Sequence, residues 1–411
     1  MKELKYIFLL GFVACACSHP DVEFINFDSF ETFKVLSVKS GDYFYEDGSL
    51  NPDVHVMEDF SLDAEPDTKV ACTDVASMAR DLIGSIESKK LVHIAGIYKG
   101  HDVDGSPLEQ SGKLIIPVSG PIKNLILVSH YTIGANFECP SETFPLEGIF
   151  AAKGYAVAIA DYIGYGVTAD RVHPYMHTES TARSVVDMGI AVRPYLEHIG
   201  RKPESEEVIL FGYSQGGSTT LAVMDMLQDE YHTEFPIKKV YAGAGPYDLA
   251  ATYDFAMEEG DTGIPCAIPM IVQGVNIGED LGLNMPDFFK PHLLEGYNDW
   301  INSKNYTVKQ INEHIGSRHI SEIMTEDGRD KHSVETARLY AALLANSVLK
   351  FYPYAPIYLF HSREDDTVPF INGQKAEQHF KGFDLKIDFG NYGNHQKGCV
   401  RFIFTAYKDL P

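Results

Sequence analysis

The chain has 411 residues, of which 45% are hydrophobic and 22% are charged, a composition typical of a globular protein. Its formal net charge of −24 argues against nucleic acid as a partner, because a nucleic-acid-binding protein needs a basic face. The same acidity disfavours electrostatic binding to an anionic membrane surface.

The first twenty residues, MKELKYIFLLGFVACACSHP, have the pattern of an export signal. A basic stretch with Lys2 and Lys5 precedes an apolar run that is too short to span a bilayer, and small residues and cysteines follow. We interpret residues 1–16 as a signal peptide of the bacterial lipoprotein type, in which Cys17 becomes the lipidated first residue. Such a protein is exported and is held at the membrane of the cell envelope only through its N-terminal lipid.

Two alternatives to this interpretation stay open. Lipidation at Cys15 would give a shorter signal, and neither cysteine has the leucine that such signals usually carry three residues upstream. Cleavage after Ala14 or Ala16 without lipidation would instead release a soluble secreted protein. No later stretch of the sequence is long and apolar enough to predict a membrane span.

Three segments precede the regular part of the chain. Residues 17–70 are acidic and aromatic with turn-forming stretches such as EDGSLNPD, and we expect an N-terminal extension there. Residues 77–86 have the apolar spacing of a helix. Residues 91–118 read as two strands joined by a turn at DVDG.

From residue 124 onward, continuous apolar runs such as LILVS, AVAIA, VILF and IYLF alternate with helical stretches. Runs of this kind are typical of strands covered on both faces in a parallel sheet. We therefore predict an α/β fold whose mostly parallel central sheet is flanked by helices, with a core of residues 71–249 and 356–411. Residues 250–355 have helical patterns and no clear strand, so we expect a helical cap or lid insertion between the sixth and seventh core strands.

A serine lies between two glycines in the stretch VILFGYSQGGSTT. Ser214 follows an apolar strand and precedes a helical stretch, as the nucleophile of a strand–turn–helix elbow does. Gly212 and Gly216 occupy the positions where a side chain would crowd the sharp turn. This context favours a nucleophile over an ordinary serine in a glycine-rich bend.

A serine nucleophile needs a base, and the base needs an acid that orients it. HSREDDTVP follows one predicted strand and offers Glu364, Asp365 and Asp366. NYGNHQ follows the last predicted strand and offers His395. These side chains come in the order serine, acid, histidine at the ends of strands where ligands bind in parallel sheets. Asp248, which follows an earlier strand, is a weaker candidate for the acid.

The GYSQGG, DYIGYG and HPY stretches, with DDTVP near the C-terminus, resemble the α/β-hydrolase superfamily, and within it the secretory-lipase and exported bacterial esterase branch. The resemblance implies the α/β-hydrolase fold from about residue 70 onward. It also implies a catalytic triad of Ser214, Asp365 and His395, because the family's D-x-x-V-P loop aligns with Asp365 rather than Asp366.

The resemblance assigns further residues around the triad. The backbone N–H groups of Gln215 and Thr132, with Tyr131 in place of Thr132 as the second choice, would form the oxyanion hole. We expect the other family-like residues to line the pocket or support its loops: His130, Asp161, Tyr162, His173 and Tyr175. His361, close to the acid, is expected to anchor its loop.

These residues predict a serine hydrolase that cleaves small-molecule or lipid carboxylic esters through an acyl-enzyme, without a metal or cofactor. One alternative is an acetyl or feruloyl esterase directed at polysaccharides, and another is a serine peptidase. An alternative of a different class is a non-catalytic surface binding protein on a hydrolase scaffold, for which a broken triad would be the signature.

Two features of the sequence allow more than one interpretation. Aromatic and aliphatic residues of the insertion either line an acyl pocket or form the core of the cap: Phe288, Phe289, Leu293, Leu294, Tyr297 and Trp300. Beyond the signal, an even set of four cysteines is compatible with two disulfides in an exported chain, or with four buried thiols: Cys72, Cys139, Cys266 and Cys399.

Overall fold

The computed structural model describes residues 25–41, 43, 51, 53–55 and 90–411. The signal peptide with Cys15 and Cys17 lies outside the described residues, and so do the helix predicted at 77–86 and Cys72.

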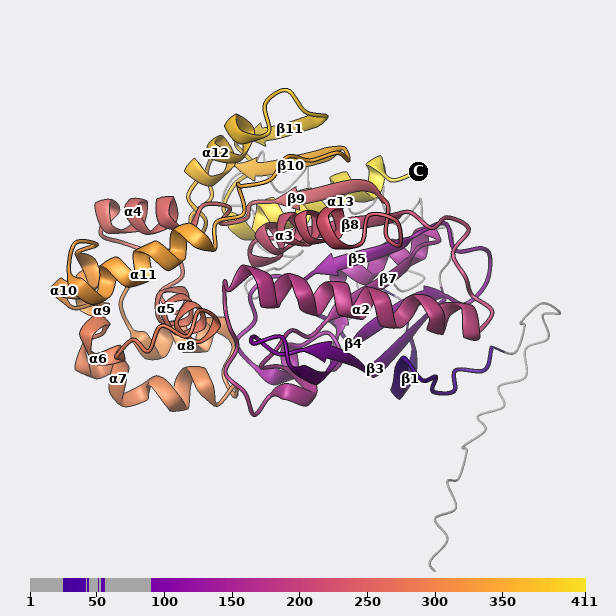
Figure 1. Ribbon diagram of the computed structural model, residues 1–411, viewed down its shortest axis with the longest axis horizontal. Helices are drawn as coiled ribbons and strands as arrows, with labels where there is room; N and C mark the ends of the chain where they lie inside the picture. Colours follow the sequence, from indigo (N-terminus) through magenta and orange to yellow (C-terminus); the bar gives the residue numbers. More distant parts are fainter. Residues whose placement is uncertain (1–24, 42, 44–50, 52, 56–89) are drawn as a thin grey trace, which may run out of the picture.

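A nine-stranded sheet forms the centre of the molecule (Figure 1). Its strands lie in the order β1, β3, β4, β7, β5, β8, β9, β10, β11, and the five neighbouring pairs from β7 to β11 are parallel. The pairs from β1 to β7 are antiparallel, and the turn at Asp102–Gly105 joins β3 to β4 as a hairpin. The bounds of the sheet strands are Phe33–Gly41 (β1), Leu91–His101 (β3), Pro107–Pro117 (β4), Leu125–Ser129 (β5), Ala156–Ala160 (β7), Val208–Tyr213 (β8), Ile237–Gly243 (β9), Ile357–Ser362 (β10) and Leu385–Gly390 (β11).

Helices cover both faces of this sheet, which explains why the parallel strands are apolar on both sides. On one face, α2 and α3 pack with strand residues in a cluster that includes Val186, Leu210 and Leu221. On the other face, α13 contributes Phe402 and Ile403 to a second cluster. These results confirm the predicted α/β fold class. The helices that flank the sheet are Thr178–His198 (α2), Gln215–Glu230 (α3), Ile371–His379 (α12) and His395–Asp409 (α13), with the 3-10 helix Leu146–Lys153.

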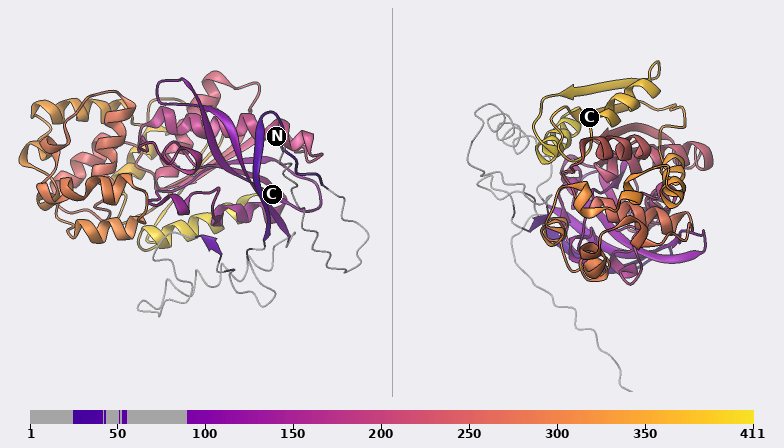
Figure 2. Two further views of the ribbon diagram at one scale, coloured as in Figure 1. Left: turned by 90° about the horizontal axis from the view of Figure 1, so that it is seen from below. Right: turned by 90° about the vertical axis from the view of Figure 1, so that its left-hand side faces the viewer.

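Between β9 and β10 the chain forms a group of helices that lies at one end of the sheet (Figures 1 and 2). These helices share an apolar core of their own, which is separate from the two clusters on the sheet. We call residues 249–345 the helical insertion. Its helices are Leu249–Glu259 (α4), Ala267–Gly278 (α5), Met285–Phe288 (α6), Pro291–Tyr297 (α7), Val308–Ile315 (α8), Ile320–Ile323 (α9), Glu326–Arg329 (α10) and Val334–Ala345 (α11), with a π-helical turn at Asn298–Asn302.

Part of the N-terminal extension belongs to the sheet. β1 pairs antiparallel with β3 from Phe33↔Tyr98 to Gly41↔Leu91, and the Phe33 side chain is fully buried. The antiparallel edge of the sheet therefore begins within the segment that the sequence places outside the core. The remaining short elements are a two-stranded sheet of Val54–His55 (β2) and Phe144–Pro145 (β6) and the 3-10 turns Asn136–Glu138 and Gly166–Thr168.

The structure corrects the expectation of two disulfides. Cys139, Cys266 and Cys399 are buried free thiols that lie in three different apolar clusters. Two disulfides would need all four cysteines, so the alternative of buried thiols holds for these three.

No helix in the described part of the chain combines the length and the apolar character needed to cross a bilayer.

Candidate active site

Ser214 lies on a sharp turn between β8 and α3, in a backbone conformation that few L-residues adopt. Its φ is 59° and its ψ is −127°, and its N–H donates to the carbonyl of Gly243 at 2.9 Å. A Cβ added at Gly216 would lie 2.0 Å from the carbonyl oxygen of Ser129, and one at Gly212 would lie 2.2 Å from the carbonyl oxygen of Gly216. Gly212 and Gly216 are therefore required, because neighbouring backbone atoms leave no room for a side chain at either position.

Gln215 is the first residue of α3, where backbone N–H groups have no acceptor within the helix. Its side-chain amide donates to Nε2 of His173 at 3.1 Å, while Nδ1–H of His173 donates to the carbonyl of Ile163 at 2.7 Å. Burial lowers the pKa of His173 to about 3, so the ring stays neutral and keeps Nε2 as an acceptor. The hydrogen bond to His173 thus fixes the side chain of Gln215, the residue that follows Ser214.

Asp365 and His395 form a buried hydrogen-bonded pair. Nδ1 of His395 lies 2.6 Å from Oδ2 of Asp365, and the two side chains are 2% and 0% exposed. Because an ionised carboxylate only accepts hydrogen bonds, Nδ1 carries the proton and Nε2 is left with a lone pair. Nε2 is buried, and none of the described residues forms a hydrogen bond with it.

Further donors hold the Asp365 carboxylate in its ionised form. Its Oδ1 accepts hydrogen bonds from the N–H groups of Thr367 and Val368 at 2.9 and 2.8 Å. Burial opposes ionisation, but the electrostatic interaction with His395 and hydrogen bonding to His361 and His395 outweigh it, so the pKa of Asp365 lies well below its usual range. Nε2 of His361 lies 3.5 Å from Oδ2 of Asp365 and 3.1 Å from the carbonyl oxygen of Val368, a position that anchors this loop.

The other candidate acids lie elsewhere. Oδ1 of Asp366 accepts from the backbone N–H of His395 at 3.2 Å, and no hydrogen bond joins it to the imidazole ring. Asp248 caps α4 by accepting from the N–H of Ala251 and forms an ion pair with Lys375 at 2.9 Å. Neither carboxylate orients His395.

The loop after β5 lies beside Ser214. The hydroxyl of Thr132 is 2.7 Å from the Tyr175 hydroxyl, and Thr132 lines two cavities together with Ser214. Glu138 stabilises this loop, because its Oε2 accepts hydrogen bonds from the N–H groups of Gly134 and Ala135 at 3.0 and 2.8 Å. Tyr131 is buried and contacts only the smaller of the two cavities.

Of the other family-like residues, Tyr175 lines the larger cavity, whereas a buried layer that lines neither cavity is formed by His130, Asp161, Tyr162 and His173. The rings of His130 and Tyr162 stack at 3.9 Å, and Nδ1–H of His130 donates to the carbonyl of Tyr131. Asp161 accepts from the Ser111 hydroxyl at 2.6 Å and from the N–H of Ser141 at 2.8 Å. These contacts connect β4, β5 and β7 and support the loops around Ser214.

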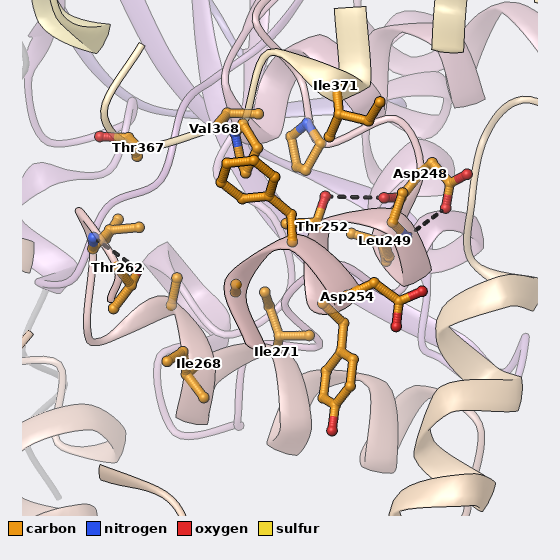
Figure 3. A pocket seen from close by; sticks show the side chains of 18 of the residues that line it. Asp248, Leu249, Thr252, Asp254, Thr262, Ile268, Ile271, Thr367, Val368 and Ile371 are labelled. Atoms are coloured by element: carbon orange, nitrogen blue, oxygen red, sulfur yellow. Dashed lines mark hydrogen bonds between the residues drawn. The ribbon is translucent and has the colours of Figure 1, made fainter. Parts of the chain in front are cut away.

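A cavity of about 950 Å³ lies between Ser214 and the helical insertion (Figure 3). Ile268 and Ile271 of α5 face it from one side, and Val368 and Ile371 face it from the loop before α12 and the start of that helix (Figure 3). Hydroxyl and carboxylate groups also belong to its wall, among them those of Thr252, Thr262, Asp248 and Asp254. The cavity is large and mostly apolar, as pockets for small organic ligands usually are.

The aromatic residues singled out in the insertion are not part of this cavity. Phe288, Phe289, Leu293 and Tyr297 are buried in the apolar core of the insertion, and Leu294 and Trp300 pack against that core. The second interpretation of these residues, as core of the insertion, therefore holds. Within the insertion, the apolar wall of the cavity comes instead from α4, α5 and α11. The sequence of a short amphipathic helix does not show which of its faces lies against the cavity.

A second cavity of about 400 Å³ meets the first at Ser214 and Thr132. It contacts His395 and Gln396 at the start of α13 and residues of α8 in the insertion. His395 lines this smaller cavity but not the larger one. Neither Glu138 nor Gln396 belongs to a spacing pattern from which a role at the site could be predicted.

Across the described part of the chain, no group of three or more histidine, cysteine, aspartate or glutamate side chains is arranged to hold a metal ion.

Three solved structures similar to this one are described as a hydrolase, an esterase and a lipase. A protein described as a hydrolase from Legionella pneumophila matches with a TM-score of 0.71 and 21% identity, covering 82% of this chain and 94% of that one. The rice cell wall degrading esterase LipA from Xanthomonas oryzae matches with a TM-score of 0.68 and 21% identity over 82% and 94% of the two chains. Candida antarctica lipase A matches with a TM-score of 0.56 and 16% identity over 77% and 75%. At these identities the likeness establishes the fold.

The comparison with curated proteins gave no match. The model of the secretory lipase family matches residues 141–395, a segment that includes Ser214, Asp365 and His395. This segment is more than half of the sequence, and the chain therefore belongs to the secretory lipase family of carboxylic-ester hydrolases.

Proposed function

We propose that the protein hydrolyses carboxylic esters through a triad of Ser214, His395 and Asp365 and a covalent acyl-enzyme. The observation that carries this proposal is the pair formed by His395 and Asp365 at 2.6 Å. No described residue forms a hydrogen bond with the second ring nitrogen of His395, and this histidine lines the smaller of the two cavities that Ser214 lines. A base in this tautomer is oriented to accept a hydroxyl proton.

In the first half of the reaction, Ser214 Oγ attacks the ester carbonyl carbon while its proton passes to Nε2 of His395. The carbonyl π electrons move to oxygen, and the N–H groups of Gln215 and Thr132 stabilise the oxyanion. The oxyanion then re-forms the carbonyl, the bond to the alcohol oxygen breaks, and His395 gives its proton to that oxygen. Asp365 stays ionised and stabilises the imidazolium.

In the second half, water takes the place of the alcohol. His395 removes a proton from water, whose oxygen attacks the acyl carbonyl, and the proton returns to Ser214 Oγ as the acid leaves.

The larger cavity fits the acyl half of the ester. Its wall is mostly apolar and it begins at Ser214 and Gln215. Burying each additional CH₂ contributes about 0.8 kcal/mol, so an octanoyl chain could gain up to about 3 kcal/mol over a butanoyl chain. We expect medium and long acyl chains to be hydrolysed with a higher kcat/KM than acetyl groups.

The test is hydrolysis of p-nitrophenyl acetate, butanoate, octanoate and palmitate by the wild type and by Ser214→Ala. Ser205→Ala, which replaces a serine away from both cavities, is the matched control. We expect Ser214→Ala to lose at least about three orders of magnitude in kcat and the control to retain wild-type activity. Activity that survives in Ser214→Ala would overturn the proposal.

The same assays separate the alternatives. Activity on acetyl or feruloyl esters alone would select an enzyme that removes such groups from polysaccharides, a reading that the name of the cell wall degrading esterase LipA favours. Activity on aryl amides would select a peptidase. An intact fold with no activity on any of these substrates would indicate a binding protein.

We further propose that the enzyme is exported and anchored through a lipid on Cys17. The basic and apolar pattern of residues 1–16 supports this proposal, as does membership of a family of secretory lipases. Expression in a bacterial host with labelled palmitate would show incorporation that Cys17→Ser abolishes. If the label instead depends on Cys15, that residue is the lipidation site, and if no label enters, the protein is not a lipoprotein.

A further inference from the structure

The helical insertion packs directly against the loop after β5, which carries Thr132. The contact is made by the segment of the insertion between its π-helical turn and α8. A Cβ added at Gly134 would lie 2.6 Å from the carbonyl oxygen of Tyr306, so the two backbones touch at this point. The N–H of Asn136 donates a hydrogen bond to the carbonyl of Lys304 at 2.8 Å. The insertion therefore shares a backbone interface with the loop of one proposed oxyanion donor.

Lys304, in this segment, has an unusual backbone and an unusual side-chain environment. Its φ is 54°, in the left-handed region that favours glycine, and the residue is only 5% exposed. Its ammonium donates to the carbonyls of Ala169 and Arg171 and lies 5.7 Å from the centre of the Tyr165 ring. Burial lowers the pKa of Lys304 to about 8, although Asp170 acts in the opposite direction. Both features cost free energy, so the surrounding contacts must hold the residue in place.

One set of contacts leads from Lys304 to the loop of Thr132. The Tyr165 ring lies beside the ammonium, and its hydroxyl donates to the carbonyl of Ile133 at 2.7 Å. Further along the same loop, the N–H of Asn136 donates to the carbonyl of Lys304. The side chain and the backbone of Lys304 thus stabilise the loop at two separate points.

A second set of contacts leads from Lys304 to Gln215. The carbonyl of Arg171, which accepts from the ammonium, comes two residues before His173, and the side chain of Gln215 donates to Nε2 of His173 at 3.1 Å. Burial lowers the pKa of His173, and the positive charge of Lys304 acts in the same direction, which keeps this acceptor neutral. Lys304, Tyr165 and His173 line a cavity of only about 20 Å³, so little free volume lies between them.

We propose that Lys304 is a positioning residue for the oxyanion hole, through which the helical insertion fixes the backbone of both Thr132 and Gln215. This inference rests on the proposed function, in which the N–H groups of these two residues bind the oxyanion. Such a donor is effective only when it points to the place where the negative charge develops, and losing one lowers kcat by about 10²–10³. Without the ammonium both donors remain but are less precisely placed, so the loss in kcat should be smaller and KM should change little.

The test is Lys304→Met, which removes the ammonium and keeps an unbranched side chain. We expect kcat for p-nitrophenyl butanoate to fall at least about tenfold while KM stays within about twofold. Lys153→Met is the matched control. The Lys153 ammonium also donates to two backbone carbonyls, those of Tyr407 and Leu410, and lies 5.0 Å from the centre of the Tyr407 ring, but the residue lines neither cavity. This control should keep the wild-type kcat.

Inhibition by butylboronic acid tests the oxyanion hole separately from the ester. Ser214 Oγ bonds to boron and its proton passes to His395, so that one oxygen of the tetrahedral boronate takes the place of the oxyanion. We expect the Ki of butylboronic acid to rise in Lys304→Met by about the factor by which kcat falls. A purely structural role of Lys304 would lower the stability to urea and leave this Ki unchanged in the folded protein.

Gly134→Ala changes the same contact from the side of the loop and keeps the inference testable if Lys304→Met does not fold. Its Cβ would displace the loop from the carbonyl of Tyr306, and we expect the same fall in kcat and rise in Ki. A folded variant of either kind with wild-type kcat would overturn the inference. So would a change in KM alone, or a fall in kcat without a rise in the Ki of butylboronic acid. Absence of Ser214-dependent hydrolysis in the wild type would instead overturn the proposed function.

Discussion

Oδ2 of Asp365 lies 2.6 Å from Nδ1 of His395, although Asp365 lies in the loop after β10 and His395 is the first residue of α13, after β11. Both side chains are buried, and the backbone N–H groups of Thr367 and Val368 donate hydrogen bonds to the other carboxylate oxygen of Asp365. The geometry therefore gives His395 one fixed ring orientation and one fixed tautomer.

Replacing Asp365 by asparagine should lower kcat by about three to four orders of magnitude, because the amide no longer stabilises the imidazolium or fixes the tautomer. Asp366→Asn is the matched variant, since its carboxylate accepts hydrogen bonds from the backbone N–H of His395 and the hydroxyl of Thr367 but not from the imidazole ring, and we expect it to lose less than about tenfold. Steady-state hydrolysis of p-nitrophenyl butanoate measures both. The reverse order would show that Asp366 is the acid.

The turn at Ser214 should be intolerant of a methyl group at Gly216. Its new Cβ would lie 2.0 Å from the Ser129 carbonyl oxygen, so Gly216→Ala should destabilise the fold by several kcal/mol and abolish esterase activity. Gly200→Ala is the control, because it has a φ of +71° but its Cβ meets no atom within 4 Å, and it should cost only about 1 kcal/mol. Urea unfolding measures both free energies, and comparable losses would show that packing beneath the turn is loose.

Glu147 should make the fold less stable as the pH rises towards neutrality. Burial among apolar residues raises its pKa from an ordinary value of 4.5 to about 7. Between these two pH values the unfolded chain releases the proton that the folded chain keeps, so the free energy of unfolding falls by about 1.4 kcal/mol per pH unit. The neutral variant Glu147→Gln lacks this contribution to the pH dependence of the free energy of unfolding.

Urea unfolding at pH 5 and pH 8 measures the effect of Glu147. Relative to the wild type, Glu147→Gln should gain up to about 3 kcal/mol of stability between the two pH values. Glu326→Gln, on a short helix at the surface of the insertion, is the control and should show no such gain. A difference between Glu147→Gln and wild type that is independent of pH would contradict the account.

The three described cysteines should behave as inert thiols. Burial raises the pKa of the Cys139 and Cys399 thiols, which keeps both protonated and unreactive, and Cys266 is fully buried. Iodoacetamide should leave all three unmodified in the folded protein and alkylate them completely in denaturant without reductant. Peptide mapping that finds any of them in a disulfide would contradict the structure.

The sequence was sufficient to predict the central sheet and the helices on its faces, because continuous apolar runs and amphipathic periods depend on local pattern. It also pointed to Asp365 rather than Asp366, and the structure places Asp365 against the ring of His395. The catalytic roles of these residues remain predictions. The edge strand β1 was missed because an exposed edge strand alternates irregularly and lies in an acidic segment.

The cavity walls could not be predicted. The apolar residues of the insertion are similar in kind whether they pack in its core, as Phe289 does, or face Ser214, as Ile271 does. Only the packing of α4, α5 and α11 separates the two groups.

The most direct test of the account is covalent labelling of the nucleophile. The protein is treated with a p-nitrophenyl alkylphosphonate, which a serine hydrolase attacks with loss of nitrophenolate, and the digested protein is analysed by mass spectrometry. The account predicts one phosphonyl group per molecule, on Ser214, formed in proportion to the loss of esterase activity and absent from His395→Ala. Loss of activity with the label on another residue, or with Ser214 unmodified, would contradict it.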